Sequence, residues 1–421
     1  MFENLVLAQK QEREKLLTQK YVWRQKLSQS SQFLSSDLVK VITGPRRSGK
    51  SIFSLLLLAK KNFAYLNFDD ENLLKVANYD ELVRAIFSVY QNPQFFLFDE
   101  IQNLPRWEIF VNKLHRRGYN LILTGSNANL LSRELGTFLT GRYLATEVLP
   151  FSFPEFLAAK EFPTNAQKSS LPEQKGQILQ LFSTYLFRGG FPEVVVKNLE
   201  PESYLGTLFE AVLFKDVVKR YRVRFSAQID ELASYLVTNF TGSFSFNKLK
   251  NVLGFASTKT VQNYLSYLEE AYLALVLPPF SFKKKEQIKR QRKVYLIDNG
   301  LAAAKAFQFS PNTGKLLENL VLVELLRKGH HLGRELFSYQ TRNQKEVDFL
   351  LKTGNKVETL IQVCEDVGEP EVKKRELGAL LEANEEVGAK NLLVVTHDLE
   401  TEETFRKKKF KFLPLWRWLL G

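Results

Sequence analysis

Cysteine, histidine and long apolar runs are all scarce in this chain of 421 residues. The single cysteine, Cys364, excludes a disulfide framework and a zinc site built from thiolates. The 4 histidines are too scattered along the chain to predict a histidine-based metal cluster. No apolar run approaches the roughly 18 residues that span a bilayer, and the first residues lack the apolar segment of a secretory signal. We therefore expect a cytoplasmic protein with no membrane span.

Positive charge is in excess. Lys and Arg number 59 against 46 Asp and Glu, which leaves a net charge of +13. An excess of this size favours a polyanionic partner such as nucleic acid, or an anionic membrane surface. The segment densest in basic residues, 283–293, holds seven basic residues and one acidic residue. A species-wide preference for lysine is the alternative explanation. The location of the basic residues in the chain distinguishes the two explanations.

Short apolar segments alternate with amphipathic ones in the first third of the chain. This alternation predicts a parallel β-sheet covered by helices on both faces, and so an α/β fold. The predicted strands are residues 38–43, 63–68, 95–98, 121–124 and 142–149, and the predicted helices between them are residues 51–60, 80–90 and 107–116.

A phosphate-binding loop follows the first of these strands. It consists of Gly44, Pro45, Arg46, Arg47, Ser48, Gly49, Lys50 and Ser51, which fit the pattern G-x-x-x-x-G-K-[ST]. Backbone N–H groups of such a loop surround the β-phosphate at a helix N-terminus. The lysine reaches the β- and γ-phosphates, and the serine hydroxyl binds Mg²⁺. We therefore predict ATP and Mg²⁺ as ligands, with Lys50 also catalytic and Ser51 also a metal ligand.

Two carboxylates end the apolar strand at residues 95–98. We predict that Asp99 helps to hold the magnesium ion and that Glu100 acts as the general base that activates water. A residue that orients water favours hydrolysis over nucleotide storage.

Two further parts of the pocket are predicted from strand ends. Ser126 and Asn127 follow the strand at residues 121–124 and are candidates for sensing the γ-phosphate, and Asn127 is assigned a catalytic role. Arg142 and Arg133 are candidate arginine fingers that would act on a neighbouring subunit. An arginine at a strand end can equally be a structural or solvated charge.

Residues 246–265 read as a helix, a glycine turn and a second helix capped by Ser257. The following residues 275–297 are predicted to form two strands joined by the lysine-rich run, which makes a winged helix with a basic wing. DNA contacts are predicted for Lys259, Lys283, Lys284, Lys285, Lys289 and Arg290. Winged helices also bind proteins or act as structural lids, and a lysine-rich loop can be a solvated hairpin tip.

Several sequence segments together resemble a known family. The chain is similar to prokaryotic AAA-type ATPases that carry a winged helix and a restriction-endonuclease-like domain. The segments that carry this resemblance are GPRRSGKS, FFLFDEIQ, LTGSN and GRYLATEVLPFSFPEFL, and later LFRGGFPEVV, KVYLIDNGL and EVDFLLKTG. The resemblance implies a cytoplasmic, oligomeric ATPase. It divides the chain into a helical arm (1–36), a P-loop ATPase core (37–154), a helical lid (155–225), a winged helix (226–298) and a C-terminal α/β domain of restriction-endonuclease type (299–421).

The last of these domains lacks a complete nuclease motif. A nuclease of this type needs two carboxylates on adjacent strands and a lysine two residues after the second. Asp348 fits the first carboxylate and Glu318 can assist, but Gln362 and Cys364 stand where the glutamate and the lysine belong. We predict the fold without nuclease activity.

The preferred hypothesis is a Mg²⁺-dependent ATPase that couples its nucleotide state to DNA binding. One alternative is a nucleotide-driven switch that acts on a protein partner, and a weaker one is an ATP-gated nuclease. A homo-oligomer follows if the arginine finger is supplied by a neighbouring copy.

Overall fold

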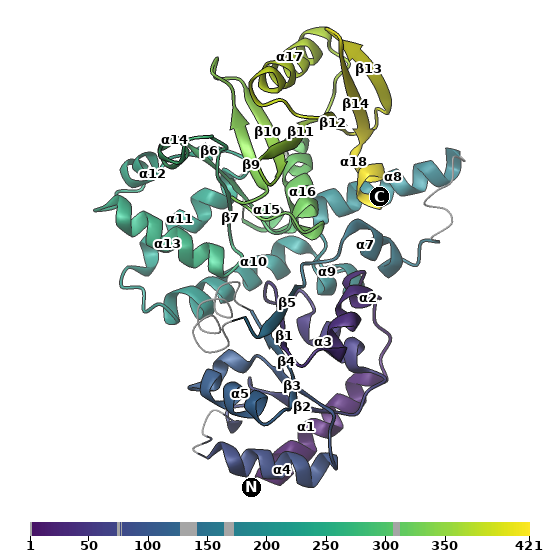
Figure 1. Ribbon diagram of the computed structural model, residues 1–421, viewed down its shortest axis with the longest axis vertical. Helices are drawn as coiled ribbons and strands as arrows, with labels where there is room; N and C mark the ends of the chain where they lie inside the picture. Colours follow the sequence, from purple (N-terminus) through teal and green to yellow (C-terminus); the bar gives the residue numbers. More distant parts are fainter. Residues whose placement is uncertain (1, 74–75, 77, 127–140, 164–171, 306–311) are drawn as a thin grey trace. The chain divides into compact units, whose positions relative to one another are not determined.

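The computed structural model describes residues 2–73, 76, 78–126, 141–163, 172–305 and 312–421 (Figure 1). Its chain divides into two compact units, residues 1–150 and 151–421, which are described one at a time. No helix in the described part is long and apolar enough to cross a bilayer. The α/β fold expected from the sequence is confirmed.

The first unit is built on a five-stranded parallel sheet with the strand order β2-β3-β4-β1-β5. All five residues of β1 and of β3 are buried, as expected for strands covered on both faces. The elements of this unit are α1 (Phe2–Leu17), α2 (Lys26–Ser31), β1 (Val39–Thr43), α3 (Lys50–Leu58), β2 (Phe63–Asn67), α4 (Tyr79–Tyr90), β3 (Phe95–Asp99), α5 (Trp107–Arg116), β4 (Asn120–Gly125) and β5 (Tyr143–Glu147).

Alternate residues of each strand enter two separate cores. Phe96 and Phe98 of β3 pack with α1, α4 and α5, whereas Phe95 and Leu97 pack with α3 on the other face. Because side chains alternate along a strand, one apolar run serves both cores. The parallel arrangement brings the carboxyl ends of β1, β3 and β4 to one edge of the sheet.

The second unit begins with helices and continues with a small and a larger sheet. Its first elements are α7 (Phe153–Ala159), α8 (Pro172–Arg188), α9 (Pro192–Lys197), α10 (Pro201–Val212), the π-helix η5 (Leu213–Lys219), α11 (Ser226–Thr238), β6 (Ser243–Phe244), α12 (Phe246–Val252), α13 (Thr258–Glu270), β7 (Leu275–Leu277), α14 (Lys284–Lys289), β8 (Arg292–Tyr295) and α15 (Gly300–Lys305).

Strands β6, β8 and β7 form an antiparallel three-stranded sheet beside α11, α12 and α13. The predicted helix cap is confirmed, because the Ser257 side chain accepts a hydrogen bond from the Thr260 N–H. The lysine-rich run differs from the expected loop. It folds into the short helix α14, none of whose residues is buried.

A six-stranded mixed sheet, ordered β13-β14-β12-β11-β10-β9, forms the rest of the unit. Helices α17 and α16 lie on opposite sides of it (Figure 1). Its elements are α16 (Thr313–Arg327), β9 (Leu336–Gln340), β10 (Glu346–Thr353), β11 (Lys356–Cys364), α17 (Pro370–Val387), β12 (Asn391–Thr396), β13 (Thr401–Phe405), β14 (Lys408–Pro414) and α18 (Leu415–Leu420).

Candidate active site

The predicted phosphate-binding loop joins β1 to α3 at the carboxyl edge of the parallel sheet. Gly44 has φ 145°, and a Cβ atom there would lie 2.1 Å from the Val148 carbonyl oxygen. Gly49, with φ 92°, precedes the first turn of α3. Both positions therefore require glycine, since an L-amino acid would be strained at the first by contact and at both by backbone angle.

Lys50 is buried at the start of α3, with 4% of its surface exposed. Its ammonium group donates a hydrogen bond to the Pro45 carbonyl at 3.0 Å and lies 3.9 Å from a Glu100 carboxylate oxygen. The lysine thus bends back over its own loop, toward the region that a phosphate group would fill.

Asp99 joins the loop to the neighbouring strand. The Ser51 hydroxyl donates to Asp99 Oδ1 at 3.0 Å, the Tyr65 hydroxyl donates to Oδ2 at 3.3 Å, and Thr124 also donates to Oδ1. Burial and the nearby Glu100 charge raise the pKa of Asp99 to about 6, and the hydrogen bonds from Thr124 and Ser51 limit that rise. A carboxylate in this position favours the binding of a cation.

Glu100 is held in a left-handed backbone conformation, with φ 50°. Its N–H donates to Thr124 Oγ1 at 2.9 Å, and its carboxylate accepts a hydrogen bond from the Gln102 side chain. This unusual backbone turns the two adjacent carboxylates to different tasks, with Asp99 toward Ser51 and Glu100 toward Lys50. Non-glycine residues with positive φ are often found at functional sites.

Two buried hydroxyl groups at this edge fit a polar ligand. The Oγ atoms of Ser48 and Ser126 are buried and have no hydrogen-bond partner among the described residues. Buried polar groups are nearly always paired in folded proteins, so each of these atoms needs a partner from outside the described chain. Ser51 and Asp99 also offer oxygen atoms as metal ligands, so the residues at this edge of the sheet fit a nucleotide phosphate with Mg²⁺.

The structure brings together most, but not all, of the predicted site residues. The loop, Asp99, Glu100 and Ser126 meet at one edge, whereas Arg142 is exposed and precedes β5. Tyr143 pairs with Val39 at the start of β1, so Arg142 lies at the amino edge, away from the loop of its own chain. Asn127 and Arg133 lie outside the described residues.

Sequence reasoning missed Arg24, which supports the loop from the N-terminal segment. Its guanidinium donates to the Ser48 carbonyl at 3.0 Å and to the Leu149 carbonyl at 2.6 Å. No motif marks such a residue, because its two partners are backbone atoms of distant segments. Thr124 was within a quoted strand, and its place opposite Asp99 becomes visible only from the strand order.

A second buried charge cluster lies between the two sheets of the second unit. The Lys293 ammonium of β8 contacts Glu318 at 2.9 Å, Asp348 at 3.0 Å and also Glu346. The Tyr295 hydroxyl donates to Glu318 at 2.6 Å. Burial alone lowers the pKa of Lys293, but the electrostatic influence of the neighbouring Tyr295, Asp348, Glu318 and Glu346 raises it well above its usual range.

Among the predicted nuclease-type residues, Glu318 and Asp348 thus share one ammonium group, and Lys293 was not foreseen from the sequence. Gln362 instead donates to Glu376 of α17 at 2.8 Å, and Cys364 is buried. In the described part of the chain, no three histidine, cysteine or carboxylate side chains are arranged to hold a metal ion.

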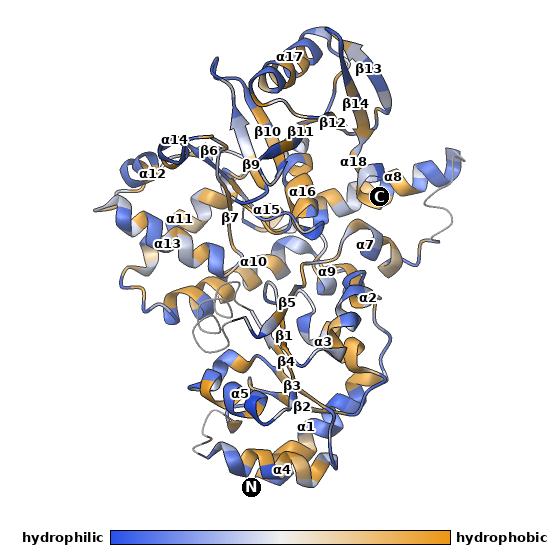
Figure 2. Ribbon diagram, in the orientation of Figure 1, coloured by the Kyte–Doolittle hydropathy of each residue, from blue (hydrophilic) through white to orange (hydrophobic). Residues whose placement is uncertain are grey.

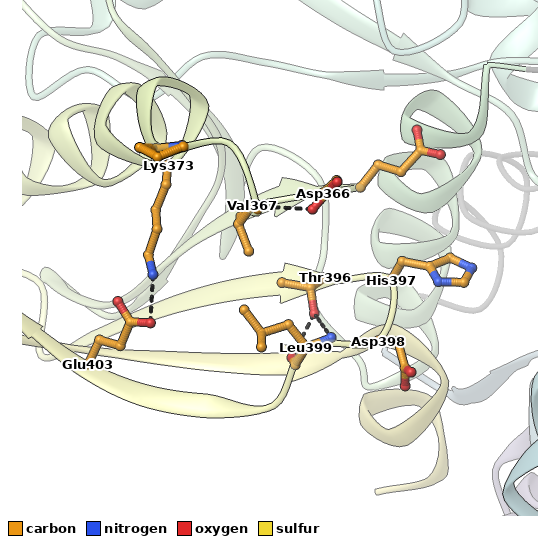
Figure 3. A pocket seen from close by; sticks show the side chains of 11 residues that line it. Asp366, Val367, Lys373, Thr396, His397, Asp398, Leu399 and Glu403 are labelled. Carbon is orange, nitrogen blue, oxygen red and sulfur yellow. Dashed lines mark hydrogen bonds and ion pairs between the residues drawn. The ribbon is translucent and has the colours of Figure 1, made fainter.

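A hollow of 860 Å³ opens at the carboxyl ends of β11 and β12 (Figure 3). Several of its polar side chains have partners: Lys373 pairs with Glu403 at 2.6 Å, and the Thr396 hydroxyl bonds to Leu399. Asp398 accepts a hydrogen bond from Trp416 at 3.3 Å.

Comparison with known proteins gives three domain matches along the chain. Residues 36–157 match a family described as an AAA domain, and residues 179–312 and 313–418 match two domains of unknown function. An uncharacterized protein of Methanocaldococcus jannaschii, MJ1544, is 35% identical over 91% of this chain and 88% of its own length. An uncharacterized protein of Haemophilus influenzae is 32% identical over 82% and 86%. A Walker-type ATPase of Pyrococcus abyssi covers 68% of this chain and 95% of its own, with 15% identity and a TM-score of 0.44.

Proposed function

This chain belongs to the family of AAA-domain proteins that includes MJ1544 of Methanocaldococcus jannaschii, and on that premise we propose that it binds ATP with Mg²⁺ and hydrolyses it. The observation that carries the proposal is the hydrogen bond between Ser51 and Asp99, which joins the loop to the acidic strand. A metal ion held by two elements in this way would lie beside the phosphates that the loop surrounds.

Each residue of the pocket then has a chemical task. Lys50 and the loop N–H groups bind the phosphate oxygens and stabilise the charge that develops on them. Glu100 orients the attacking water and accepts its proton. Ser51 and Asp99 would hold Mg²⁺, which would supply further positive charge beside the phosphates.

Two assignments extend this reaction beyond the described pocket. Asn127 is proposed to sense the γ-phosphate, since it follows Ser126 directly in the sequence. Arg142 is exposed at the other edge of the sheet, so a role as arginine finger requires a second copy of the chain. We therefore propose a homo-oligomer, located in the cytoplasm.

The second part of the proposal is that nucleotide state is coupled to DNA binding. Helices α11, α12 and α13 with the three-stranded sheet have the element order of a winged helix, which supports that assignment. Lys259 is exposed at the start of α13, and Lys283, Lys284, Lys285 and Lys289 are exposed in the connection between β7 and β8. Arg290 is less available, since it donates to the Gln340 carbonyl at 3.1 Å.

The test is ATPase activity measured with Mg²⁺, with and without single-stranded, duplex and branched DNA. Activity is expected in the wild type, its loss in Lys50→Ala, and a change of rate when DNA is added. Glu100→Gln is expected to retain ATP binding while turnover falls roughly 10²–10⁴-fold. A Glu100→Gln protein that still hydrolyses ATP at the wild-type rate would rule out this pocket as the catalytic site. Turnover that ignores DNA, with a stable protein bound in a pull-down, would favour the protein-partner switch.

A further inference from the structure

The connection between β7 and β8, residues 278–291, exposes apolar side chains among positive charges. Phe282 is 73% exposed and Ile288 is 59% exposed. Lys283, Lys284 and Lys285 follow Phe282 directly, and the ribbon at α14 is mostly hydrophilic in Figure 2. Residues 283–290 carry five basic groups and one acidic group, a net charge of +4.

Phe282 is held on a rigid base. Its ring packs edge-on against Phe280, with ring centroids 5.0 Å apart and an interplanar angle of 78°. Phe280 is buried, belongs to the core beneath α17, and donates its N–H to the Ser338 carbonyl at 2.7 Å. The ring of Phe282 thus contacts an anchored residue of the core while 73% of the residue stays exposed.

Local hydrogen bonds also shape the residues that follow Phe282. The Ser281 hydroxyl accepts from the Lys283 N–H at 3.2 Å and donates to Glu286 at 3.0 Å. Glu286 in addition lies 3.6 Å from the Lys283 ammonium. The one acidic side chain of this segment is therefore paired locally, so the positive charges of the other lysines dominate the surface around the ring.

The chemistry of this surface selects its partner. Lysine ammonium groups attract phosphates, whereas an exposed phenyl ring gains most from a flat apolar face such as a nucleobase. Bases in an intact duplex are stacked on one another and cannot offer that face. A purely electrostatic duplex-binding loop would not need an aromatic residue beside its lysines.

We propose that Phe282 stacks on an unpaired base of DNA while Lys283, Lys284 and Lys285 hold the phosphate backbone on either side of it. The inference deepens the DNA binding proposed above and depends on it. It names the partner as DNA with exposed bases: a single strand, or the single-stranded part of a fork.

Fluorescence anisotropy with the full-length protein tests this inference. The probes are a 20-nucleotide single strand, its blunt duplex and a forked duplex. Phe282→Ala is expected to weaken binding to the single strand and the fork by roughly 5- to 100-fold, the loss of one base–aromatic stack. Duplex affinity is expected to change less than twofold, and Phe282→Trp to restore single-strand binding. Phe225→Ala is the matched control, because Phe225 is also exposed, at 58%, and lies elsewhere in the same unit.

A charge variant separates failure of this inference from failure of DNA binding itself. Lys283→Glu/Lys284→Glu/Lys285→Glu is expected to weaken all three probes and to reduce the salt dependence of binding. If this variant binds as the wild type does, the proposed DNA contact of this connection fails. If it weakens binding but Phe282→Ala affects single strand and duplex equally, only the stacking is overturned. Binding to phosphatidylserine vesicles that is lost in Phe282→Ala, while DNA binding is kept, would assign the ring to a membrane surface and also overturn it.

Discussion

Lys50 and Lys293 are equally buried, each with 4% of its surface exposed, but their surroundings differ. Lys50 donates a hydrogen bond to the neutral Pro45 carbonyl and lies 3.9 Å from a Glu100 carboxylate oxygen. Lys293 contacts three carboxylates, those of Glu318 at 2.9 Å, of Asp348 at 3.0 Å and of Glu346. The charge of Lys293 is thus compensated by carboxylates of the fold, whereas the loop before Lys50 holds Ser48, whose buried Oγ has no hydrogen-bond partner among the described residues. Burial of a lysine therefore indicates function only when its partners are considered.

The largest expected effect comes from Lys293→Met, which would leave Glu318, Asp348 and Glu346 without their shared cation. Removal of one partner from a buried ion pair costs about 3–5 kcal/mol. Hydrogen exchange followed by mass spectrometry should show faster exchange in peptides of β8 and β10, and unchanged exchange in the loop at residues 44–51.

The control for this change is Lys305→Met. Lys305 pairs with an exposed carboxylate, Glu210, at 2.8 Å. Surface pairs contribute roughly 0–1 kcal/mol, so little change in exchange is expected. Equal effects of the two substitutions would show that the Lys293 cluster is not a strong cross-link.

Lys50→Met should affect turnover more than stability, the opposite of what is expected for Lys293→Met. We expect a loss of turnover of roughly 10²–10³-fold, since a positive charge that stabilises the transferring phosphoryl group is removed. The unfolding free energy should change less than it does in Lys293→Met. Phosphate release and urea unfolding measure the two quantities, and a Lys50→Met protein that keeps its turnover would remove the basis of the comparison.

The pH dependence of stability should report the second cluster. Burial and the Asp348 charge raise the pKa of Glu318 from 4.5 to about 7. The folded state therefore keeps this proton at a pH where the unfolded chain releases it, and the stability gained at low pH is lost as the pH rises through 7. We expect a loss on the order of 2 kcal/mol between pH 5 and pH 8. In Glu318→Gln this part of the slope should disappear from urea unfolding curves, and an unchanged slope would assign it to other groups.

A smaller effect on the ATP site is expected for Arg24→Ala than for Lys50→Met. This change removes the donors to the Ser48 and Leu149 carbonyls. A hydrogen bond from a charged group contributes about 1.5–3 kcal/mol to the free energy of unfolding. Only part of that loss should reach the nucleotide, so we expect ATP affinity, measured by titration of a fluorescent analogue, to fall less than tenfold. Lys26→Ala is the control, since Lys26 donates to the Glu147 carbonyl at 3.0 Å. If both variants bind ATP as the wild type does, Arg24 supports the fold and not the loop.

Much of the first unit was predictable from local pattern. The strand at residues 95–98, the loop at residues 44–51 and the carboxylates after β3 needed only apolar runs, glycines and a motif. The structure also places β4 between β1 and β3, which is the arrangement assumed when Ser126 was assigned to the pocket. Arg24 could not be predicted, because its partners are carbonyl groups that any residue type would supply.

In the second unit, local pattern found elements but missed how their charges combine. Asp348 and Gln362 were assigned to positions on adjacent strands, and they lie on β10 and β11, which pair with each other. Lys293 was counted with the basic run, although it is buried and faces Glu318 and Asp348. The position of a lysine in a lysine-rich run does not show to which side its side chain points, since neighbouring residues of a strand point to opposite faces.

The sequence by itself therefore determined the α/β core, its phosphate loop and the residue types available for binding Mg²⁺, because these depend on short motifs and on periodicity. Only the tertiary structure decided which lysine is neutralised by carboxylates, which arginine supports the loop and which phenylalanine stays exposed. Those outcomes depend on contacts between segments far apart in the chain, and their energies depend on burial and on distances between charges.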